Sequence, residues 1–387
     1  MGKAFSDKIF EIFHAERYSK IPAKNLCLYG AGTLGKKLTT LLVNAGTPPL
    51  CLTDGDPEKW GVKVTGIPIR SPQDAAERFG QTATFVVTAF NRALEADFNE
   101  IAAFLKNLNV TTIVPYPLCA LNFPDDLLPH FAQGSPTCLE DDFEAIVTAG
   151  NLFSDAMSQS FFLDMLKVST TADYASFTPP STQKEQYFIA ETMRDLGRLH
   201  MVDCGAYNGD TLKSFLDSYG GSRLGSWHAF EPDPQNFEQL EIFVESLPDE
   251  LKKNIFLYNC ATGDKSQQIE FISGLGEGSA LVVDDSSGSA KITIQTRPID
   301  SVLQNKEINF IKMDVEGYES ESLTGAAETI ADHKPTLAIC VYHKPKDFFQ
   351  IPNQITQFRG IMDTPTQYLM RRTYAYFYET VFFAIPR

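Results

Sequence analysis

The sequence predicts an α/β protein with two domains, each containing a doubly wound and mostly parallel sheet. Three observations lead to this prediction. Short apolar runs alternate with stretches of helical periodicity in two separate blocks. In each block a glycine turn follows the first apolar run, at YGAGTLGKKL (29–38) and DCGAYNGDTLKSF (203–215). A proline-rich stretch at 115–136 separates the blocks, and 387 residues suit two domains.

The first domain is expected at residues 1–125. Its strands are predicted at 25–29, 50–54, 66–69, 84–90 and 111–116. The helix after the glycine turn carries leucines on one face and ends at Gly46. An amphipathic helix near the N-terminus, with Phe5 and Ile9 on its apolar face, is expected to pack on this first domain.

Residues 126–186 are expected to form a helical linker or lid. The prolines of 115–136 cannot continue a helix or a central strand, so they mark the domain boundary. The second domain is expected at 187–387. Its five parallel strands are predicted at 199–204, 226–231, 254–260, 308–314 and 336–342, and an antiparallel pair in 368–387 completes a seven-stranded sheet.

Charge and composition limit the partners. Lys and Arg total 33 against 49 Asp and Glu, a net charge of −16, so we expect no nucleic-acid partner. No apolar run reaches the length of a membrane span. The seven cysteines include no C-x-x-C pair and are expected to be reduced core thiols, which predicts a cytoplasmic protein without a metal. The sequence does not indicate an oligomeric state.

The glycine turn of the second domain favours a cationic ligand. Gly205 and Gly209 permit close approach of a ligand, but Ala206 replaces the middle glycine of a dinucleotide loop. Asp210 is expected to cap the next helix, where a carboxylate disfavours phosphate. S-adenosylmethionine has a sulfonium, an ammonium and no phosphate, so it fits this loop. Asp210 acting only as a cap is the alternative.

Acidic and amide side chains follow the next strands. Glu231 ends the second strand, where a carboxylate can accept both ribose hydroxyls. Asn259 and Asp264 follow the third strand near the expected adenine edge, although Asn259 suits a turn equally well. Asp314 and Glu316 follow the fourth strand at the mouth of the site, unless they form only a solvated loop face.

The motifs DCGAYNGDT, AFEPDPQNFEQL, NCATGD, TRPID, INFIKMDVEGYE and RRTYAYFYETVFFA resemble, as a set, the FkbM family of S-adenosylmethionine-dependent methyltransferases. The resemblance covers about 187–387 and implies the seven-stranded class I methyltransferase fold. It also implies O-methylation of a hydroxyl on a sugar, polysaccharide or natural product. By this resemblance Asp203, Gly205, Tyr207, Gly209 and Glu231 map onto cofactor contacts, and Asp314 and Glu316 onto the edge of the active site. Asp203 orienting the loop without touching the ligand is the alternative.

A hydroxyl acceptor needs a base, and the candidates are Asp314, Glu316 and His343. His343 follows the fifth strand and is the sharpest candidate by chemistry, with a capping or orienting role as its alternative. A further alternative is that Asp314 and Glu316 bind a divalent cation, although the sequence shows no third ligand. The family often has a histidine near the closing strands, where this chain has Arg371 and Arg372.

The first glycine turn supports a rival function. Gly30, Gly32 and Gly35 complete G-x-G-x-x-G, and Asp54 ends the next strand where it could meet a ribose. This pattern suits NAD or another nucleotide, and hence an NAD-dependent oxidoreductase or epimerase. The chain lacks a matching catalytic constellation, so a Rossmann-like scaffold is the expected reading. A non-enzymatic adenosylmethionine sensor is the third class. Loop 274–290 is expected to border a small-molecule or carbohydrate acceptor.

Overall fold

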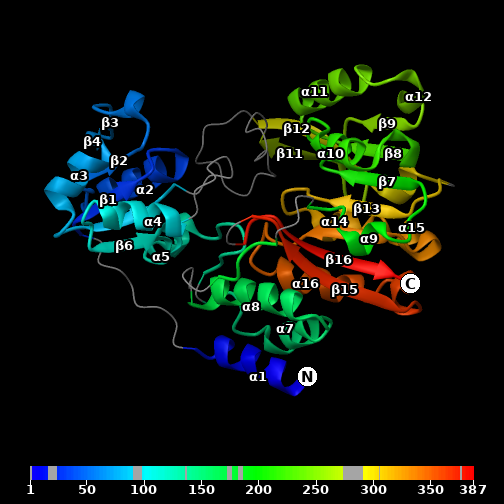
Figure 1. The fold of residues 1–387 in the computed structure, drawn as a ribbon, viewed down its shortest axis with the longest axis horizontal. Coiled ribbons are helices and arrows are strands. Elements are labelled where there is room, and N and C mark those ends of the chain that lie inside the picture. Colours follow the sequence, from blue (N-terminus) through cyan, green and yellow to red (C-terminus); the bar gives the residue numbers. More distant parts are fainter. Residues whose placement is uncertain are drawn as a thin grey trace. The chain divides into compact units, whose positions relative to one another are not determined.

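The structure is a computed structural model that describes residues 2–15, 24–89, 98–135, 137–171, 177–181, 186–272, 291–304, 306–374 and 377–387. The chain forms two compact units (Figure 1). The N-terminal unit comprises His14–Leu139 and Lys167–Phe177, and the C-terminal unit comprises Met1–Phe13, Glu140–Leu166 and Thr178–Arg387. The expected loop at 274–290 lies outside the described residues.

The N-terminal unit contains a six-stranded sheet in the order β3-β4-β2-β1-β5-β6. All neighbours pair in parallel except β3 and β4. The sheet reverses its winding at β1, which lies between β2 and β5, as a doubly wound fold requires. The strands are β1 (Leu26–Tyr29), β2 (Cys51–Thr53), β3 (Lys63–Val64), β4 (Ile67–Arg70), β5 (Thr84–Val87) and β6 (Thr112–Pro115). This confirms the strand positions predicted from the apolar runs.

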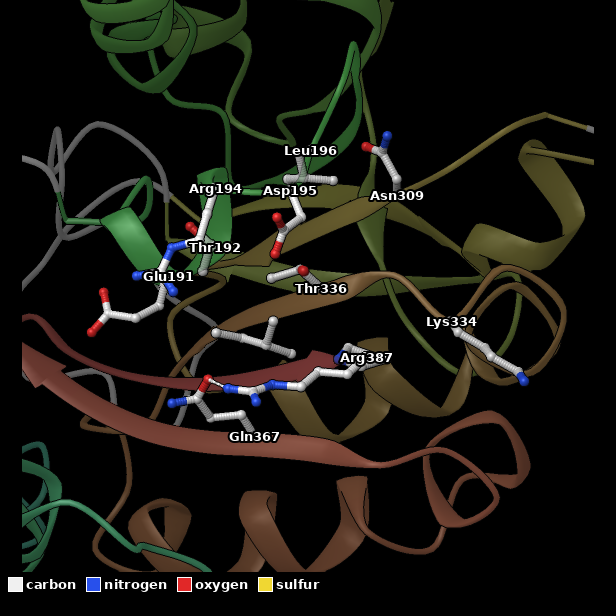
Figure 2. A pocket seen from close by; sticks show the side chains of 12 residues that line it. Glu191, Thr192, Arg194, Asp195, Leu196, Asn309, Lys334, Thr336, Gln367 and Arg387 are labelled. Atoms are coloured by element: carbon white, nitrogen blue, oxygen red, sulfur yellow. Dashed lines mark hydrogen bonds between the residues drawn. The ribbon is translucent and has the colours of Figure 1, made fainter.

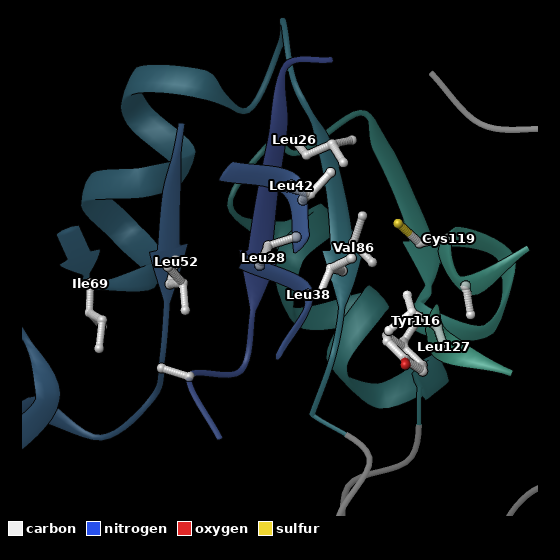
Figure 3. Packing of buried hydrophobic residues seen from close by; sticks show 12 residues of the cluster. Leu26, Leu28, Leu38, Leu42, Leu52, Ile69, Val86, Tyr116, Cys119 and Leu127 are labelled. Atoms are coloured by element: carbon white, nitrogen blue, oxygen red, sulfur yellow. The ribbon is translucent and has the colours of Figure 1, made fainter. Parts of the chain in front are cut away.

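Helix α2 covers one face of this sheet. Its leucines Leu38 and Leu42 pack on Leu28 and Val86, and all four are fully buried (Figure 3). The opposite face carries a second apolar cluster around Phe85. The helices of the unit are α2 (Thr33–Asn44), η1 (Pro57–Lys59), α3 (Pro72–Phe79), α4 (Phe98–Asn107), α5 (Tyr116–Ala120) and α6 (Pro124–Leu127).

The proline-rich stretch does not mark the boundary between the units. It forms α5 and α6, with prolines in the first turn of each helix, where a missing backbone N–H costs little. Tyr116, Cys119 and Leu127 from these helices join the core beside β6 (Figure 3). The unit therefore extends beyond the expected boundary at 125, as far as Leu139.

The C-terminal unit contains a seven-stranded sheet in the order β15-β16-β14-β13-β7-β8-β9. Five strands pair in parallel, while β16 runs antiparallel to β14 and β15. The winding reverses at β7, so the carboxyl ends of β7, β8 and β13 meet at one edge. The strands are β7 (Leu199–Cys204), β8 (Leu224–Phe230), β9 (Ile255–Tyr258), β13 (Phe310–Met313), β14 (Thr336–Cys340), β15 (Thr366–Arg372) and β16 (Thr380–Pro386). The predicted α/β class and the seven-stranded methyltransferase-type fold are confirmed.

A small three-stranded sheet, in the order β10-β12-β11, was not anticipated from the sequence. It consists of β10 (Ala261–Thr262), β11 (Gln267–Ile272) and β12 (Lys291–Arg297). The burial of β12 alternates along KITIQTR, with Ile294 and Thr296 inward. Such alternation is the sign of a half-buried strand, and it was available in the sequence.

The helices of the C-terminal unit flank its large sheet (Figure 1). They are α1 (Gly2–Phe13), α7 (Phe143–Gly150), α8 (Ala156–Thr171, whose last residues belong to the N-terminal unit), α9 (Ala190–Met193), α10 (Asp210–Tyr219), η2 (Gly221–Arg223), α11 (Pro234–Glu245), α12 (Asp249–Lys252), α13 (Ile299–Val302), α14 (Glu319–Thr324), α15 (Ala327–His333), α16 (Asp347–Ile355) and α17 (Arg359–Met362). In the part of the chain that the structure describes, no helix is both long and apolar enough to span a membrane.

The expectation that the N-terminal helix packs on the first domain is wrong. Helix α1 packs on α7 in the C-terminal unit, with the Phe13 and Phe143 rings 5.1 Å apart. Phe5 of α1 lies 6.4 Å from Phe162 of α8, and its side chain is buried. An amphipathic pattern shows that a helix has a buried face but does not identify the surface that covers it.

Much of the segment expected as a linker or lid is fixed to the C-terminal unit. Arg371 on β15 pairs with Asp155 at 3.2 Å, just before α8. Arg372 is fully buried and pairs with Asp164 on α8 at 3.2 Å, with its guanidinium 4.7 Å from the Phe161 ring centre. The two arginines therefore connect the closing strands to α8, and the units differ from the expected boundaries at 125 and 186.

Candidate functional site

The glycine turn after β7 fits between the ends of its two neighbouring strands. Gly205 has φ +76°, and a Cβ there would lie 1.9 Å from the carbonyl oxygen of Asp314. The backbone N–H groups of Gly205 and Ala206 both donate to the carbonyl of Phe230 at 3.0 Å. Only glycine allows this approach, so the turn joins the carboxyl ends of β7, β8 and β13.

The turn then enters α10 through two further left-handed residues, Tyr207 (φ +47°) and Gly209 (φ +89°). A Cβ on Gly209 would lie 2.5 Å from the Phe243 ring, so packing against α11 contributes to the need for glycine. Gly209 is the N-cap of α10, and Asp210 is its first residue. The expectation that Asp210 caps the helix is therefore wrong, but its exposed carboxylate still lies at the helix start.

Glu231, directly after β8, is held by the same turn. Its Oε2 accepts a hydrogen bond from the Tyr207 N–H and its Oε1 accepts one from the Asp233 N–H, each at 2.9 Å. The side chain is only 5% exposed. Burial raises the pKa of Glu231 to about 7, against the opposing effect of these two backbone donors. The carboxylate is fixed in orientation at the site where a ribose was expected.

The residues expected near the adenine lie after β9 in two different settings. Asn259 donates from Nδ2 to the carbonyl oxygen of Glu231 at 2.9 Å, so it joins the ends of β8 and β9. This contact matches the turn-stabilising alternative for Asn259. Asp264 is exposed.

Asp203 lies inside the core, where its partner is a lysine that the sequence reasoning missed. Lys312 on β13 is the register partner of Asp203 on β7, and its Nζ lies 3.1 Å from Asp203 Oδ1. Both side chains are almost fully buried. Lys312 Nζ also donates to the carbonyl of Gly205 at 2.6 Å. Burial raises the pKa of Asp203 against the lowering effect of Lys312. The pair anchors the glycine turn from below.

Asp314, directly after β13, is the centre of a hydrogen-bonded cluster. Its Oδ2 accepts from the hydroxyl of Tyr187 at 2.9 Å, and its Oδ1 lies 3.2 Å from Nε2 of His343. Tyr342 donates to Oδ1 at the long distance of 3.5 Å and to Glu379 Oε1 at 3.0 Å. Tyr187 and Tyr342 carry no motif and were not anticipated. Burial and the nearby Asp314 raise the pKa of both tyrosines well above the usual value, so they act as donors.

Glu316 lies in a tight loop held by Glu319, which the sequence reasoning also missed. Glu316 and Gly317 have φ of +53° and +93°. Glu319 Oε1 accepts from the backbone N–H of Val315 at 3.0 Å and of Gly317 at 3.3 Å. Burial raises the pKa of Glu316 to about 8, opposed by His343 and supported by the nearby Asp314. The loop holds Glu316 in an unusual backbone conformation beside Asp314.

His343 connects these carboxylates. Its Nδ1 lies 2.8 Å from Glu319 Oε1, and its Nε2 lies 3.2 Å from Asp314 Oδ1 and 3.6 Å from Glu316 Oε2. Burial alone would lower the pKa of His343, but the carboxylates raise it well above the usual value. The structure therefore brings Asp314, Glu316 and His343 together as expected. An imidazolium is a poor base, so this arrangement favours an orienting role for His343.

Close approaches within the chain fix two of the three glycines of the first glycine turn. A Cβ on Gly35 would lie 1.9 Å from the carbonyl of Gly30, and one on Gly30 (φ +112°) would lie 2.7 Å from the Ala89 nitrogen. Chain packing therefore explains both glycines. Gly32 is different, because among the described residues no atom beyond its two chain neighbours lies within 4 Å of its Cβ position. The space beside Gly32, at the start of α2, is open to a ligand.

Asp54 lies beside this turn and is bound by the chain itself. Its Oδ2 accepts from the Ala31 N–H at 2.8 Å and lies 3.1 Å from Lys59 Nζ. Burial would raise the pKa of Asp54, but the backbone donors Asp56 and Ala31 and the Lys59 ammonium keep it below the usual value. Asp54 therefore stays ionised, and its carboxylate supports the turn.

A cavity of about 680 Å³ lies at the other end of the large sheet (Figure 2). It is lined by Asn309 before β13, Thr336 at the start of β14, and Glu191 and Arg387. These positions are at the amino ends of the parallel strands, opposite the glycine turn. None of the expected site residues lines it.

Comparison with known proteins agrees with this geometry. Residues 203–376 match the profile of the methyltransferase FkbM domain. No curated protein matches. The crystal structure of methyltransferase FkbM from Methylobacillus flagellatus KT is similar, with 20% sequence identity, a TM-score of 0.75, and coverage of 99% of this chain and 100% of that chain.

Two further solved structures match in part. UDP-D-quinovosamine 4-dehydrogenase from Vibrio fischeri shares 24% identity and a TM-score of 0.21, covering 24% of this chain and 76% of that chain. The methyltransferase domain of bacterial CtHen1-CN shares 9% identity and a TM-score of 0.31, covering 51% and 95%. Because both scores are low, the fold assignment comes from the first structure. The profile match and the shared architecture lead to one conclusion: residues 203–376 form a methyltransferase domain of the FkbM family.

Proposed function

We propose that the protein is an S-adenosylmethionine-dependent O-methyltransferase that methylates a hydroxyl of a sugar, polysaccharide or natural product. One observation carries the proposal. The Glu231 carboxylate is fixed by two backbone donors beside the Gly205 turn, with the exposed carboxylate of Asp210 at the start of α10. A ribose-binding acid next to an acidic helix start suits an adenosyl sulfonium and disfavours a pyrophosphate.

Some of the residues in and around the glycine turn would contact the cofactor, and others would support the turn. Gly205, Ala206, Tyr207, Gly209 and Asp210 surround the cofactor, Glu231 binds the ribose, and Asn259 and Asp264 border the adenine. Asp203 acts through Lys312, because its side chain is fully buried. Asp314, Glu316 and His343 form the acceptor side of the site.

The reaction is a displacement at the methyl carbon. The acceptor oxygen donates an electron pair to this carbon, the carbon–sulfur bond breaks, and its electron pair returns to sulfur as a neutral thioether. The hydroxyl proton must leave before or during this step. The carboxylates beside Asp314 make the acceptor side acidic, which suits the cationic donor and a neutral small-molecule or carbohydrate acceptor.

Calorimetric titration with S-adenosylhomocysteine tests the proposal. Wild type should bind, and Glu231→Ala should lose about 1–3 kcal/mol of binding free energy, because two hydroxyls lose their acceptor. Asp217→Asn is the matched control, since this exposed carboxylate pairs only with Lys213 on α10. No binding by wild type would refute the cofactor assignment, and unchanged affinity in Glu231→Ala would remove Glu231 from the site.

The N-terminal unit supports a second candidate, the binding of NAD or another nucleotide at Gly30, Gly32, Gly35 and Asp54. The observation in its favour is Gly32, which packing does not explain. The engagement of Asp54 by Lys59 weighs against a ribose there. Stabilisation by NAD that is lost in Gly32→Val would support this candidate. Stabilisation by NAD with indifference to S-adenosylhomocysteine would favour the oxidoreductase alternative.

The remaining assignments concern the cellular compartment and the roles of the two units. We place the protein in the cytoplasm, and the cysteines support this because six of the seven are buried in the core, as reduced thiols usually are. The domain roles follow the two units, with cofactor and acceptor chemistry in the C-terminal one.

A further inference from the structure

Three carboxylates, from Asp314, Glu316 and Glu319, lie against the imidazole of His343 after β13 and β14. Nε2 of His343 lies 3.2 Å from Asp314 Oδ1 and 3.6 Å from Glu316 Oε2. The other ring nitrogen, Nδ1, lies 2.8 Å from Glu319 Oε1. Asp314 and Glu316 therefore share Nε2, while Glu319 faces Nδ1, and one ligand atom each of Asp314, Glu319 and His343 lie within 4.8 Å of one another.

We propose that His343 Nε2, Asp314 and Glu316 bind a divalent transition-metal ion such as Mn²⁺, and that Glu319 is the positioning residue of His343. The site itself stands on this geometry, while the role we give the ion in catalysis rests on the proposed methyltransferase function. Imidazole together with carboxylates suits such ions better than Mg²⁺, which prefers oxygen ligands throughout.

The distances match the edges of a coordination shell. With metal–ligand bonds of about 2.1 Å, neighbouring ligand atoms lie about 3.0–3.4 Å apart. The 3.2 Å between His343 Nε2 and Asp314 Oδ1 falls within this range. The 3.6 Å between His343 Nε2 and Glu316 Oε2 is slightly longer, and a small shift of the Glu316 side chain would close the difference. The Glu316 distance is too long for a direct hydrogen bond. A proton on Nε2 accounts for the Asp314 contact alone, whereas an ion between the three groups would account for both contacts.

Glu319 provides an independent second observation. Its side chain is 99% buried, its Oε1 receives the Val315 and Gly317 N–H groups, and its Oε2 has no hydrogen-bond partner among the described residues. Building an unsatisfied carboxylate oxygen into the protein is costly. A carboxylate on the far nitrogen of a metal-binding histidine fixes its tautomer and raises its basicity, and this provides a reason for that cost.

The negative charge of the surrounding carboxylates also favours binding of a cation. Glu379 is 1% exposed and accepts a hydrogen bond from the Tyr342 hydroxyl, which also lies 3.5 Å from Asp314 Oδ1. Asp314, Glu316 and Glu319 place three carboxylates against one imidazole, and Glu379 adds a fourth beyond the Tyr342 hydroxyl. The nearby Lys312 is directed to Asp203 and to the carbonyl of Gly205 instead. A divalent ion would offset the remaining negative charge.

Three protein ligands leave coordination positions open. In the proposed reaction the acceptor hydroxyl would occupy one of them, which lowers its pKa so that its proton passes to water. This also removes the need for His343 to act as a base. The acceptor oxygen would then be held close to the cofactor loop, since Gly205 contacts the backbone of Asp314.

The test uses the full chain and Mn²⁺ alone, followed by the electron paramagnetic resonance signal of the free ion. Wild type should bind one ion per chain. Asp314→Asn, Glu316→Gln and His343→Gln should each weaken binding at least tenfold, and His343→Gln should also lose the nitrogen hyperfine coupling. Glu319→Gln should keep the stoichiometry and weaken affinity about 10–100-fold. Glu245→Gln, an exposed carboxylate on α11, should behave as wild type.

S-adenosylhomocysteine titration of the same samples separates the two proposals and checks folding. Normal cofactor binding without saturable Mn²⁺ binding would overturn the metal site and leave the methyltransferase function standing. Mn²⁺ binding without cofactor binding would do the reverse. Mn²⁺ binding that none of the four variants changes would show an ion held elsewhere, and it would also overturn the proposal.

Discussion

Replacing Lys312 with methionine should destabilise the C-terminal unit strongly, because it leaves Asp203 buried without its cation. The two groups lie 3.1 Å apart with side-chain exposures of 3% and 0%. At an effective dielectric constant of about 20, this distance corresponds to an attraction of about 5 kcal/mol. Removing one partner of a buried pair costs about 3–5 kcal/mol. This is a large part of the typical stability of a domain.

Urea unfolding followed by tryptophan fluorescence can measure this loss. The chain has two tryptophans, the buried Trp227 in the C-terminal unit and Trp60 in the N-terminal unit. A Trp60→Phe background therefore reports on the C-terminal unit alone. In this background Lys312→Met should lower the unfolding free energy by about 3–5 kcal/mol.

A second variant separates charge burial from loop anchoring. Asp203→Leu combined with Lys312→Met removes both charges and should recover most of the stability, since apolar replacement of a buried pair is close to neutral. Cofactor affinity should stay reduced, because the Gly205 carbonyl still lacks its donor. A single variant within 1 kcal/mol of wild type, or a double variant no more stable than the single one, would refute this reasoning.

Three other predictions follow from the same geometry. Gly205→Ala should abolish S-adenosylhomocysteine binding and destabilise the C-terminal unit. The loss should be several times the ~1 kcal/mol expected for Gly220→Ala, because Gly220 has a similar positive φ but open space around its Cβ position. Equal losses in the two variants would show that the contact with Asp314 is not the cause. Burial raises the pKa of Glu231 to about 7 from 4.5, so protonated Glu231 stabilises the fold below pH 4.5 and this stability is lost as the pH rises through 7. Relative to Glu231→Gln, wild type should therefore lose on the order of 3 kcal/mol in urea unfolding between pH 4.5 and 8, and parallel pH profiles would contradict this. Gly35→Ala should destabilise the N-terminal unit by several kcal/mol, whereas Gly32→Ala should cost only about 1 kcal/mol, because it replaces the N-cap glycine of α2 without a clash; equal losses in urea unfolding would contradict this.

The strands and the turns could be predicted because their signals are local. Apolar runs bounded by turn residues gave the positions of the parallel strands, and the spacing of Gly205 and Gly209 indicated the glycine turn after β7. Asp314, Glu316 and His343 could be placed together because each follows a parallel strand of one sheet, and such ends meet at one edge.

The groups that complete the site depend on tertiary contacts. Lys312 was detectable, since a lysine inside the apolar run FIKM needs a buried acid, and Asp203 occupies the matching position of β7. Tyr187 precedes β7 without a motif, so its bond to Asp314 could not be read from the sequence. Glu319 looked like an ordinary residue in the first turn of α14, and only the structure shows it beneath His343.

The position of α1 has a consequence for how the chain folds during synthesis. Phe13 and Phe143 are 130 positions apart in the sequence, yet they pack together. At about 5–20 residues per second, the ribosome needs roughly six to twenty-six seconds to supply that partner. During this interval the apolar face of α1 stays exposed while the intervening segment is made. The nascent chain thus presents an apolar binding surface for a chaperone until Phe143 has been made.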